Sequence, residues 1–182
     1  MKEIYNNIYQ NNKRYNNSYD YKLEVVLLEI RKLAKSSKII DIGCGKGHYI
    51  RKIISEGYSS TLGIEFSDVC CKEFLCDVPH VNADFLTTNS IFVDQQFDLC
   101  VCMDVLEHIE YKNIDLMIEN IKRIGRSSIL GIANHSDVIL GQELHLIQED
   151  LLWWNNKLSQ FYSSVVVLNE LPNGRFFIFK CE

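Results

Sequence analysis

The segment that most constrains the fold lies at residues 39–49, which read IIDIGCGKGHY. An apolar run carries one acidic residue, Asp41, and three glycines follow at alternate positions, Gly43, Gly45 and Gly47. The run predicts a buried strand, and the glycines predict a tight turn whose backbone comes close to a ligand or takes a positive φ. A helix start after the turn would offer unpaired N–H groups, which suit an anionic group such as a carboxylate.

The glycine spacing excludes two phosphate-binding turns. The dinucleotide-binding pattern G-x-G-x-x-G has its third glycine three residues after the second, but position 48 of this chain is His48. The P-loop pattern needs Gly-Lys-Ser/Thr after a four-residue gap, which does not occur here. The pattern that remains is Asp-x-Gly-x-Gly-x-Gly, and its alternative interpretation is a tight strand-to-helix turn that binds nothing.

A second apolar run, at residues 61–64, ends at Glu65. An acidic side chain at the end of a second parallel strand can accept hydrogen bonds from both hydroxyls of a ribose. The next residue, Phe66, is a candidate to lie on an adenine ring. This run therefore favours a nucleoside-containing ligand over a turn without one.

Two more runs end in the same way. Residues 79–83 are followed by Asp84 and Phe85, and residues 97–103 lead into the sequence DVLEHI, which begins at Asp104. Taken with the glycine turn, these strand ends closely resemble motifs I to IV of the class I S-adenosylmethionine (SAM) dependent methyltransferases. The resemblance covers about residues 38–134 and implies SAM as the cofactor, with S-adenosylhomocysteine as the product.

The resemblance also implies a set of cofactor-binding residues at the strand ends and in the tyrosine-rich N-terminal stretch. In the family, the acidic position at Asp84 accepts from the adenine amine. In similar small methyltransferases an N-terminal segment with a tyrosine motif folds over the cofactor, and the alternative is an aromatic patch that packs this arm onto the domain. The candidates are Asp41, Gly43, Cys44, Gly45, Gly47, Glu65, Phe66, Ser67, Asp84, Phe85, Met103, Asp104, His108, Tyr15 and Tyr19.

Alternating strand and helix patterns predict an α/β fold. We expect a three-layer, Rossmann-like sandwich with a mostly parallel seven-stranded sheet and an antiparallel strand from a C-terminal hairpin. The expected strands are residues 38–43, 60–65, 79–84, 97–103, 127–133, 163–171 and 175–181, and the expected helices are residues 20–34, 46–55, 67–76, 110–124 and 148–161. Residues 1–37 are expected to form an N-terminal lid segment and helix, and residues 38–182 the methyltransferase domain, as one compact unit.

Composition narrows the possible partners and location. The chain has 182 residues, 47% of them hydrophobic, and a net charge of −5, which argues against broad binding to nucleic-acid backbones. No apolar run approaches the ~20 residues that a membrane span needs, and no signal peptide is visible. Seven cysteines show no metal-ligand spacing and fit reduced thiols. We therefore expect a cytoplasmic protein without a metal site.

Three histidines are the candidates for a catalytic base at the acceptor side. His108 follows the fourth strand, His135 follows the fifth, and His145 lies in a polar loop ahead of a Trp-Trp pair. Residues 134–154 resemble the tail of substrate-diverse bacterial methyltransferases, and this favours His145 as a base or acceptor ligand. The alternative interpretations are a positioning role for His108 and a structural hydrogen bond at a helix start for His145.

The absence of two sequence motifs after the fourth strand narrows the range of possible methyl acceptors. The fourth strand is followed neither by an Asn/Asp-Pro-Pro-aromatic sequence, typical of methylation at DNA or glutamine amino groups, nor by Pro-Cys, typical of cytosine C5 methylation. We expect methyl transfer to oxygen or nitrogen of a small-molecule or sugar acceptor. Two alternatives remain: a non-catalytic SAM-binding module of a larger complex, and a SAM-using enzyme that cleaves SAM or transfers its aminopropyl group.

Overall fold

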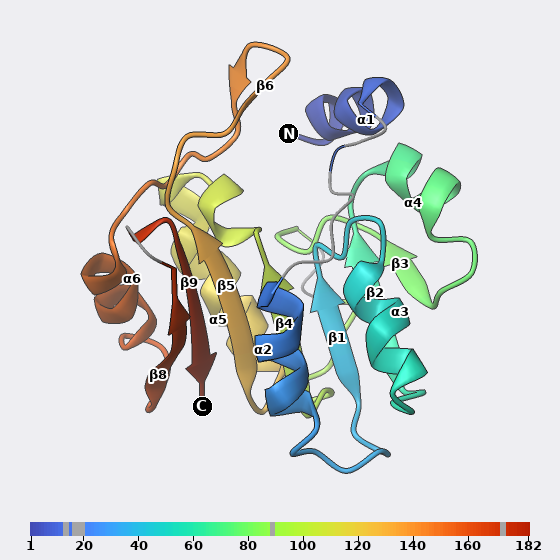
Figure 1. Ribbon diagram of the computed structural model, residues 1–182, viewed down its shortest axis with the longest axis vertical. Helices are drawn as coiled ribbons and strands as arrows, with labels where there is room; N and C mark the ends of the chain where they lie inside the picture. Colours follow the sequence, from blue (N-terminus) through green and yellow to red (C-terminus); the bar gives the residue numbers. More distant parts are fainter. Residues whose placement is uncertain (13–14, 16–20, 88–89, 172–173) are drawn as a thin grey trace.

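A single sheet of seven strands organises the part of the chain that the computed structural model describes, residues 1–12, 15, 21–87, 90–171 and 174–182 (Figure 1). The strands are β1 (Ile39–Ile42), β2 (Thr61–Glu65), β3 (His80–Asn82), β4 (Leu99–Met103), β5 (Ser128–Ala133), β8 (Val165–Glu170) and β9 (Phe176–Cys181). Their order is β3-β2-β1-β4-β5-β9-β8. All adjacent pairs are parallel except those made by β9, which runs antiparallel to β5 and β8. The expected α/β fold and its antiparallel hairpin strand are confirmed.

Helices cover both faces of the sheet because alternate side chains of the buried strands point to opposite sides. Ile40, Ile42 and Cys102 lie in one core with α5 (Ile114–Ile124) and α6 (Leu151–Leu158). Ile39 and Val101 lie in the other core, against α2 (Tyr21–Ile30) and α3 (His48–Ser55). The apolar runs read in the sequence are thus buried on both faces, as expected for a mostly parallel sheet.

The order of the strands in the sheet determines where a ligand site can lie. β1 lies at the centre and pairs in parallel with both β2 and β4, and the chain crosses from one side of β1 to the other between them. Ligands of open parallel sheets bind outside the carboxyl ends of the strands at such a switch point. The glycine turn follows β1 at this point, before α3 begins at His48.

Three local features differ from the expected elements. The N-terminal segment expected as a lid, for which no helix ahead of residue 20 was predicted, forms α1 (Lys2–Asn11), which packs on α4 (Asp68–Phe74) above the carboxyl ends of the strands (Figure 1). The polar loop after β5 contains a small hairpin, β6 (Val138–Ile139) and β7 (Gln142–Glu143).

The helix expected from residue 110 is the third difference. It is preceded by two short 3-10 helices, η1 (Leu106–His108) and η2 (Tyr111–Asn113), so α5 begins only at Ile114. None of the described helices combines the length and the apolar character needed to cross a membrane.

Candidate active site

A cavity of about 470 Å³ lies at the carboxyl ends of the central strands, with α1 contributing to its wall. Eleven of the expected cofactor residues line it: Asp41, Gly43, Cys44, Glu65, Phe66, Asp84, Phe85, Met103, Asp104, His108 and Tyr15. Gly45, Gly47 and Ser67 are not among the lining residues, and Tyr19 lies outside the described part of the chain. All three candidate base histidines also line this cavity, so cofactor and acceptor candidates share one space.

The glycine turn is held close to the sheet by its backbone. Gly43 N–H and Cys44 N–H both donate to the carbonyl of Ile64, at 2.9 and 3.1 Å. Gly43 has φ +69°, and a Cβ there would lie 2.5 Å from Val105 Cγ2. Gly47 has φ +75° and stands directly before α3. Glycine is required at these positions because a side chain would meet both backbone strain and a clash.

Backbone donors orient the Glu65 carboxylate at the end of β2. Gly45 N–H donates to Oε2 at 3.0 Å and Ser67 N–H donates to Oε1 at 2.8 Å. Burial raises the pKa of Glu65, and these backbone hydrogen bonds act in the opposite direction. Gly45 and Ser67 therefore belong to the scaffold of the site. Ser67 also begins α4, because its Oγ accepts from Cys70 N–H at 3.1 Å.

Asp41 is a buried carboxyl group in β1 that keeps one oxygen without a partner. Its side chain is 2% exposed, and Oδ2 has no hydrogen-bond partner among the described residues. Burial raises the pKa of Asp41 to about 8, and the charge of Glu65 adds to this effect. An unpartnered acceptor at the wall of a cavity is available to a donor on a ligand.

The adenine-side candidates lie on the loops after β2 and β3. Phe66 lines the cavity with its ring centroid 5.2 Å from that of Tyr5, and Phe85 is buried. Asp84 lines the cavity too, and its Oδ1 accepts from Leu86 N–H at 3.0 Å. An aromatic ring and a carboxylate from these two loops thus line the same cavity.

The helix α1 brings a second group of aromatic residues to the cavity. Tyr5 and Tyr9 are buried, and both rings contact the ring of Tyr15 edge-on, with centroids 6.3 and 5.5 Å away. Tyr5 Oη lies 2.9 Å from Nδ1 of His108. Sequence reasoning singled out Tyr15 but missed Tyr5. The signal for Tyr5 is its helical spacing to Ile8 and Tyr9, the other buried residues of α1, and this spacing has meaning only if the segment is a helix.

Three histidine rings meet at the wall of the cavity, and one of them, His108, has its centroid 5.9 Å from that of Tyr5. The centroid of His145 lies 4.7 Å from that of His108 and 4.9 Å from that of His135. His108 loses hydration here, so burial lowers its pKa to about 4, with a further contribution from the neighbouring His145. His135 is half-buried, and its Nδ1 lies 3.4 Å from the carbonyl oxygen of Arg175.

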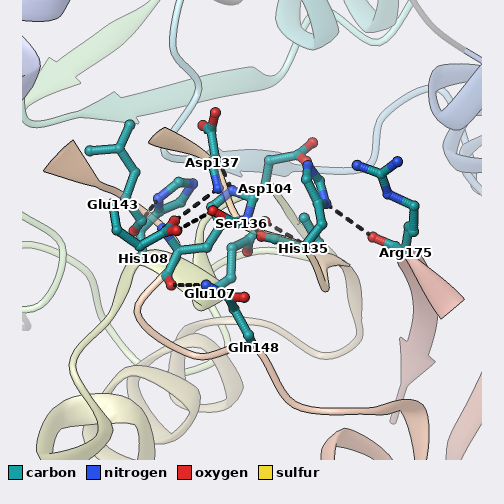
Figure 2. Close-up of polar contacts among 12 residues, drawn as sticks. Asp104, Glu107, His108, His135, Ser136, Asp137, Glu143, Gln148 and Arg175 are labelled. Atoms are coloured by element: carbon teal, nitrogen blue, oxygen red, sulfur yellow. Dashed lines mark hydrogen bonds and ion pairs between the residues drawn. The ribbon is translucent and has the colours of Figure 1, made fainter. Parts of the chain in front are cut away.

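The carboxylate of Glu143 fixes the loop that carries His145. It accepts hydrogen bonds from Ser136 Oγ, Asp137 N–H and His145 N–H, at 2.5, 2.8 and 2.9 Å (Figure 2). These bonds, led by the one from Ser136, lower the pKa of Glu143 to about 2. Sequence reasoning missed this residue because the hairpin that bends the loop back on itself has no strong turn signal.

Glu107 is the third residue that sequence reasoning missed, although it stands in the VLEH sequence. Its side chain is fully buried, and Oε1 accepts from Ala133 N–H at 2.9 Å. Oε2 has no hydrogen-bond partner among the described residues. Burial, together with the charge of Asp104, raises the pKa of Glu107 well above its ordinary value. The sequence signal that could have identified Glu107 as a residue of the site is its position next to His108, shortly after a strand.

Asp104, at the carboxyl end of β4, is paired with a lysine from α2. Lys22 Nζ lies 3.0 and 2.9 Å from the two carboxylate oxygens and 4.0 Å from the centroid of the Phe176 ring. Asp104 also has φ +55°, an uncommon conformation that aspartate tolerates better than most residues. Lys22 was not a sequence candidate, because nothing local marks a helix residue as facing this strand end.

Comparison with known proteins agrees with this arrangement. The sequence model of the family described as "Methyltransferase domain" matches residues 39–128. The ubiquinone biosynthesis O-methyltransferase of Rickettsia felis is 24% identical over 162 residues, which cover 84% of this chain and 63% of that protein. The chain thus spans less than two thirds of that relative's length.

Solved structures share the fold. A SAM dependent methyltransferase from Archaeoglobus fulgidus superposes with a TM-score of 0.67 at 12% identity, over 87% of this chain and 93% of that one. A 1,6-didemethyltoxoflavin-N1-methyltransferase from Burkholderia thailandensis superposes with a TM-score of 0.72 at 10% identity, over 98% and 84%. From the matched family, the strand order and the glycine turn after β1, this chain belongs to the class I SAM-dependent methyltransferase family, whose cofactor is SAM.

Proposed function

We propose that this chain transfers the methyl group of SAM to a small-molecule or sugar acceptor. Of the two expected acceptor atoms, oxygen and nitrogen, we propose a hydroxyl oxygen. One observation carries the proposal: a single cavity is lined both by the strand-end residues expected for SAM and by the three-histidine cluster. The Rickettsia relative, named as an O-methyltransferase, supports oxygen as the acceptor atom. Cavities of a few hundred Å³ are typical of small-molecule sites.

The residues of the cavity fit SAM on two counts. The unpartnered Oδ2 of Asp41 is a buried acceptor that suits a cationic or N–H donor of the cofactor. Each oxygen of Glu65 uses one lone pair on a backbone N–H, which leaves further acceptor positions for the ribose hydroxyls.

When bound, SAM supplies an electrophilic methyl group on a positively charged sulfur. The work left to the protein is to hold the acceptor atom in line with that methyl group, and orientation of this kind accelerates a reaction strongly. Helix α1 contributes by excluding water, since Tyr5 and Tyr9 line the cavity and are buried. The cavity is also lined by His108, His135 and His145. In this proposal the acceptor loses its proton beside these histidines.

The polar lining of the cavity favours an enzyme over a non-catalytic module. A module that only holds SAM needs no acceptor space, and its cavity would be filled by side chains beyond the cofactor. Here Asp137, His135 and His145 line the wall beyond the strand ends. We place the reaction in the cytoplasm, in keeping with seven cysteines that are all free thiols.

Calorimetry with S-adenosylhomocysteine tests the cofactor half of the proposal. The unmodified protein is expected to bind, and Glu65→Gln, which keeps the shape but removes the charge and one acceptor, is expected to weaken binding at least ~10-fold, or about 1.4 kcal/mol. Glu119→Ala, at an exposed position on α5, is the matched control and should bind as the unmodified protein does. Equal affinities for all three proteins would contradict the proposed site.

Methyl transfer is then measured with SAM labelled in its methyl group. Panels of phenols, catechols, sugars and amines are compared for label in the acceptor, and the hydroxyl-bearing classes are expected to accept it. Label that stays on sulfur, in 5′-methylthioadenosine, would instead indicate SAM cleavage or aminopropyl transfer. Binding of S-adenosylhomocysteine without turnover of any class would favour the non-catalytic module.

A further inference from the structure

Two histidines and a glutamate converge at the acceptor end of the cavity. Glu107 and His108 follow β4 (Figure 2). His145 comes from the loop after the β6–β7 hairpin. One ligand-capable atom from each of the three residues lies within 4.8 Å of the others. A set of two imidazoles and a carboxylate is the donor set of many catalytic zinc sites.

Hydrogen bonds to the backbone fix which nitrogen of each histidine carries the proton. His108 Nδ1 lies 2.9 Å from the carbonyl oxygen of Leu144, and His145 Nδ1 lies 2.5 Å from that of His135. A carbonyl oxygen can only accept, so both Nδ1 atoms carry the proton, and in the neutral ring each Nε2 keeps its lone pair. The Tyr5 hydroxyl, which also lies 2.9 Å from His108 Nδ1, is then an acceptor of that proton, and the Nε2 of His145 lies 3.9 Å from Asp137 Oδ2. Metal-binding histidines are held in this way, with the second ring N–H donated to a carbonyl.

Glu107 is held in a matching arrangement. Its Oε1 accepts from Ala133 N–H, which fixes the carboxylate, while its fully buried Oε2 has no partner among the described residues. A buried carboxylate oxygen without a donor is costly unless a cation or donor joins it. The two neighbouring rings do not satisfy it in this arrangement, because their protons lie on the Nδ1 atoms, which are 2.9 and 2.5 Å from carbonyl oxygens.

We propose that Glu107, His108 and His145 bind a divalent metal ion through the Glu107 carboxylate and the two Nε2 atoms. Nitrogen donors favour a transition metal such as Zn²⁺, Mn²⁺ or Fe²⁺ over Mg²⁺ or Ca²⁺, which prefer oxygen ligands. Three protein ligands leave at least one coordination position open, and both histidines line the cavity.

This inference rests on the proposed function for the role of the ion, though not for its binding. An acceptor hydroxyl at the open position would have its pKa lowered by the metal, so that the oxygen can attack as an alkoxide or phenoxide. His108 and His145 would then be metal ligands and not general bases. His135 remains the candidate to receive the proton, because its ring adjoins that of His145.

Metal binding is tested on protein stripped with EDTA and dialysed free of it. Zn²⁺ is titrated in competition with a chromophoric chelator, and the unmodified protein is expected to bind one equivalent. Glu107→Gln and His145→Asn are each expected to lower the affinity at least 10-fold, as loss of ligand or supporting groups does at metal sites. The d–d spectrum of added Co²⁺ gives an independent readout, because its intensity and position report the nitrogen ligands.

His80→Asn is the matched control. His80 is also half-buried, with Nδ1 3.1 Å from a carbonyl oxygen, but it lies on β3 and does not line the cavity. Its variant should bind Zn²⁺ as the unmodified protein does. Circular dichroism of each stripped variant separates loss of a ligand from loss of the fold. No stoichiometric Zn²⁺ or Co²⁺ binding by the folded, unmodified protein, or equal affinity in all variants, would overturn the metal site.

The outcomes for the two proposals are distinguishable. S-adenosylhomocysteine is titrated into the same stripped protein, which should still bind it because the strand-end residues are unchanged. Methyl transfer is expected to stop in EDTA and return on adding Zn²⁺ or Mn²⁺. Full transfer in EDTA would overturn the metal proposal and leave the methyltransferase function standing. Metal binding without binding of S-adenosylhomocysteine would support the site and contradict the function.

Discussion

Two buried carboxyl groups on adjacent strands, Glu65 and Asp41, differ in the hydrogen-bond donors around them. Glu65 has a backbone N–H on each oxygen, at 3.0 and 2.8 Å, so its charge is supported even though it is buried. No described residue donates to Oδ2 of Asp41, and burial raises the pKa of this group to about 8. Asp41 therefore costs the folded state stability near neutral pH, and a residue with such a cost is expected to serve the ligand site.

Asp41→Asn is expected to stabilise the cofactor-free protein at pH 8. The pKa of Asp41 is higher in the folded state than the ordinary value of 3.8, so the folded state holds a proton that the unfolded chain has lost between pH 4 and 8. The contribution of Asp41 to stability is therefore full below pH 4 and falls as the pH rises through 8. The asparagine variant lacks this decline and should be more stable at pH 8 by roughly 1–3 kcal/mol.

Urea unfolding of both proteins at pH 4, 6 and 8 measures the effect. The difference between the two proteins should grow with pH, since the other titrating groups are common to both and largely cancel. A difference that stays constant across this range, or one that favours the unmodified protein at pH 8, would contradict a raised pKa for Asp41.

At the scale of elements, the position of α1 depends on a few polar contacts. Asn6 Oδ1 accepts from Ser67 Oγ at 2.8 Å and from Val69 N–H at 3.3 Å, which ties the helix to the start of α4. Tyr5 reaches His108 from the same helix. An isolated helix of ten residues is marginal in water, so these tertiary contacts decide whether α1 covers the cavity.

Asn6→Ala is expected to loosen α1 with little effect on the rest of the fold. Loss of these contacts should cost about 0.5–1.5 kcal/mol of local stability and raise amide hydrogen exchange in α1 about 2- to 10-fold. Release of S-adenosylhomocysteine should become faster by a similar factor if α1 covers the ligand. Exchange is followed by mass spectrometry and release by stopped flow.

The matched control is Asn7→Ala on the same helix. Asn7 is exposed, and its side chain contacts Asn11 within α1 and nothing on α4 that the structure describes. Both rates should stay close to those of the unmodified protein. Equal acceleration in the two variants would mean that helix propensity, and not docking on α4, controls the lid.

At the scale of the whole molecule, burial determines which cysteine thiols can react. Six of them are buried and Cys76 is exposed. Burial raises the pKa of the thiols, as at Cys100 and Cys181, and an uncharged thiol reacts poorly with electrophiles. The two cores and the site are thus protected from alkylation by the same packing that forms the sheet.

Treatment of the folded protein with N-ethylmaleimide is therefore expected to add one label, at Cys76. The same treatment in 6 M guanidinium should add seven, because unfolding exposes every thiol. Intact-mass and peptide analysis count and locate the labels. Rapid labelling of Cys44 in the folded protein would show that the glycine turn opens to solvent.

Much of the fold and the cofactor half of the site followed from local patterns. Apolar runs buried on both faces predicted β1, β4 and β5, and residues directly after strands 1, 2 and 4 line the cavity because parallel strands end at one edge. The helix α1 and the β6–β7 hairpin were not predicted. Polar, asparagine-rich and short segments carry little periodicity, so their structure depends on what they pack against.

The sequence by itself determined the glycine turn, the order of strands and helices, and which residues stand at strand ends, since all of these depend on neighbours along the chain. Only the tertiary structure decided that His145 comes back to His108, and that α1 contributes to the wall of the cavity. It also decided that Glu107 is buried close to both histidines, with one oxygen that no described residue contacts by a hydrogen bond. The physical reason is that such contacts depend on the path of loops and on packing between distant segments. Neither is encoded by spacing within one segment.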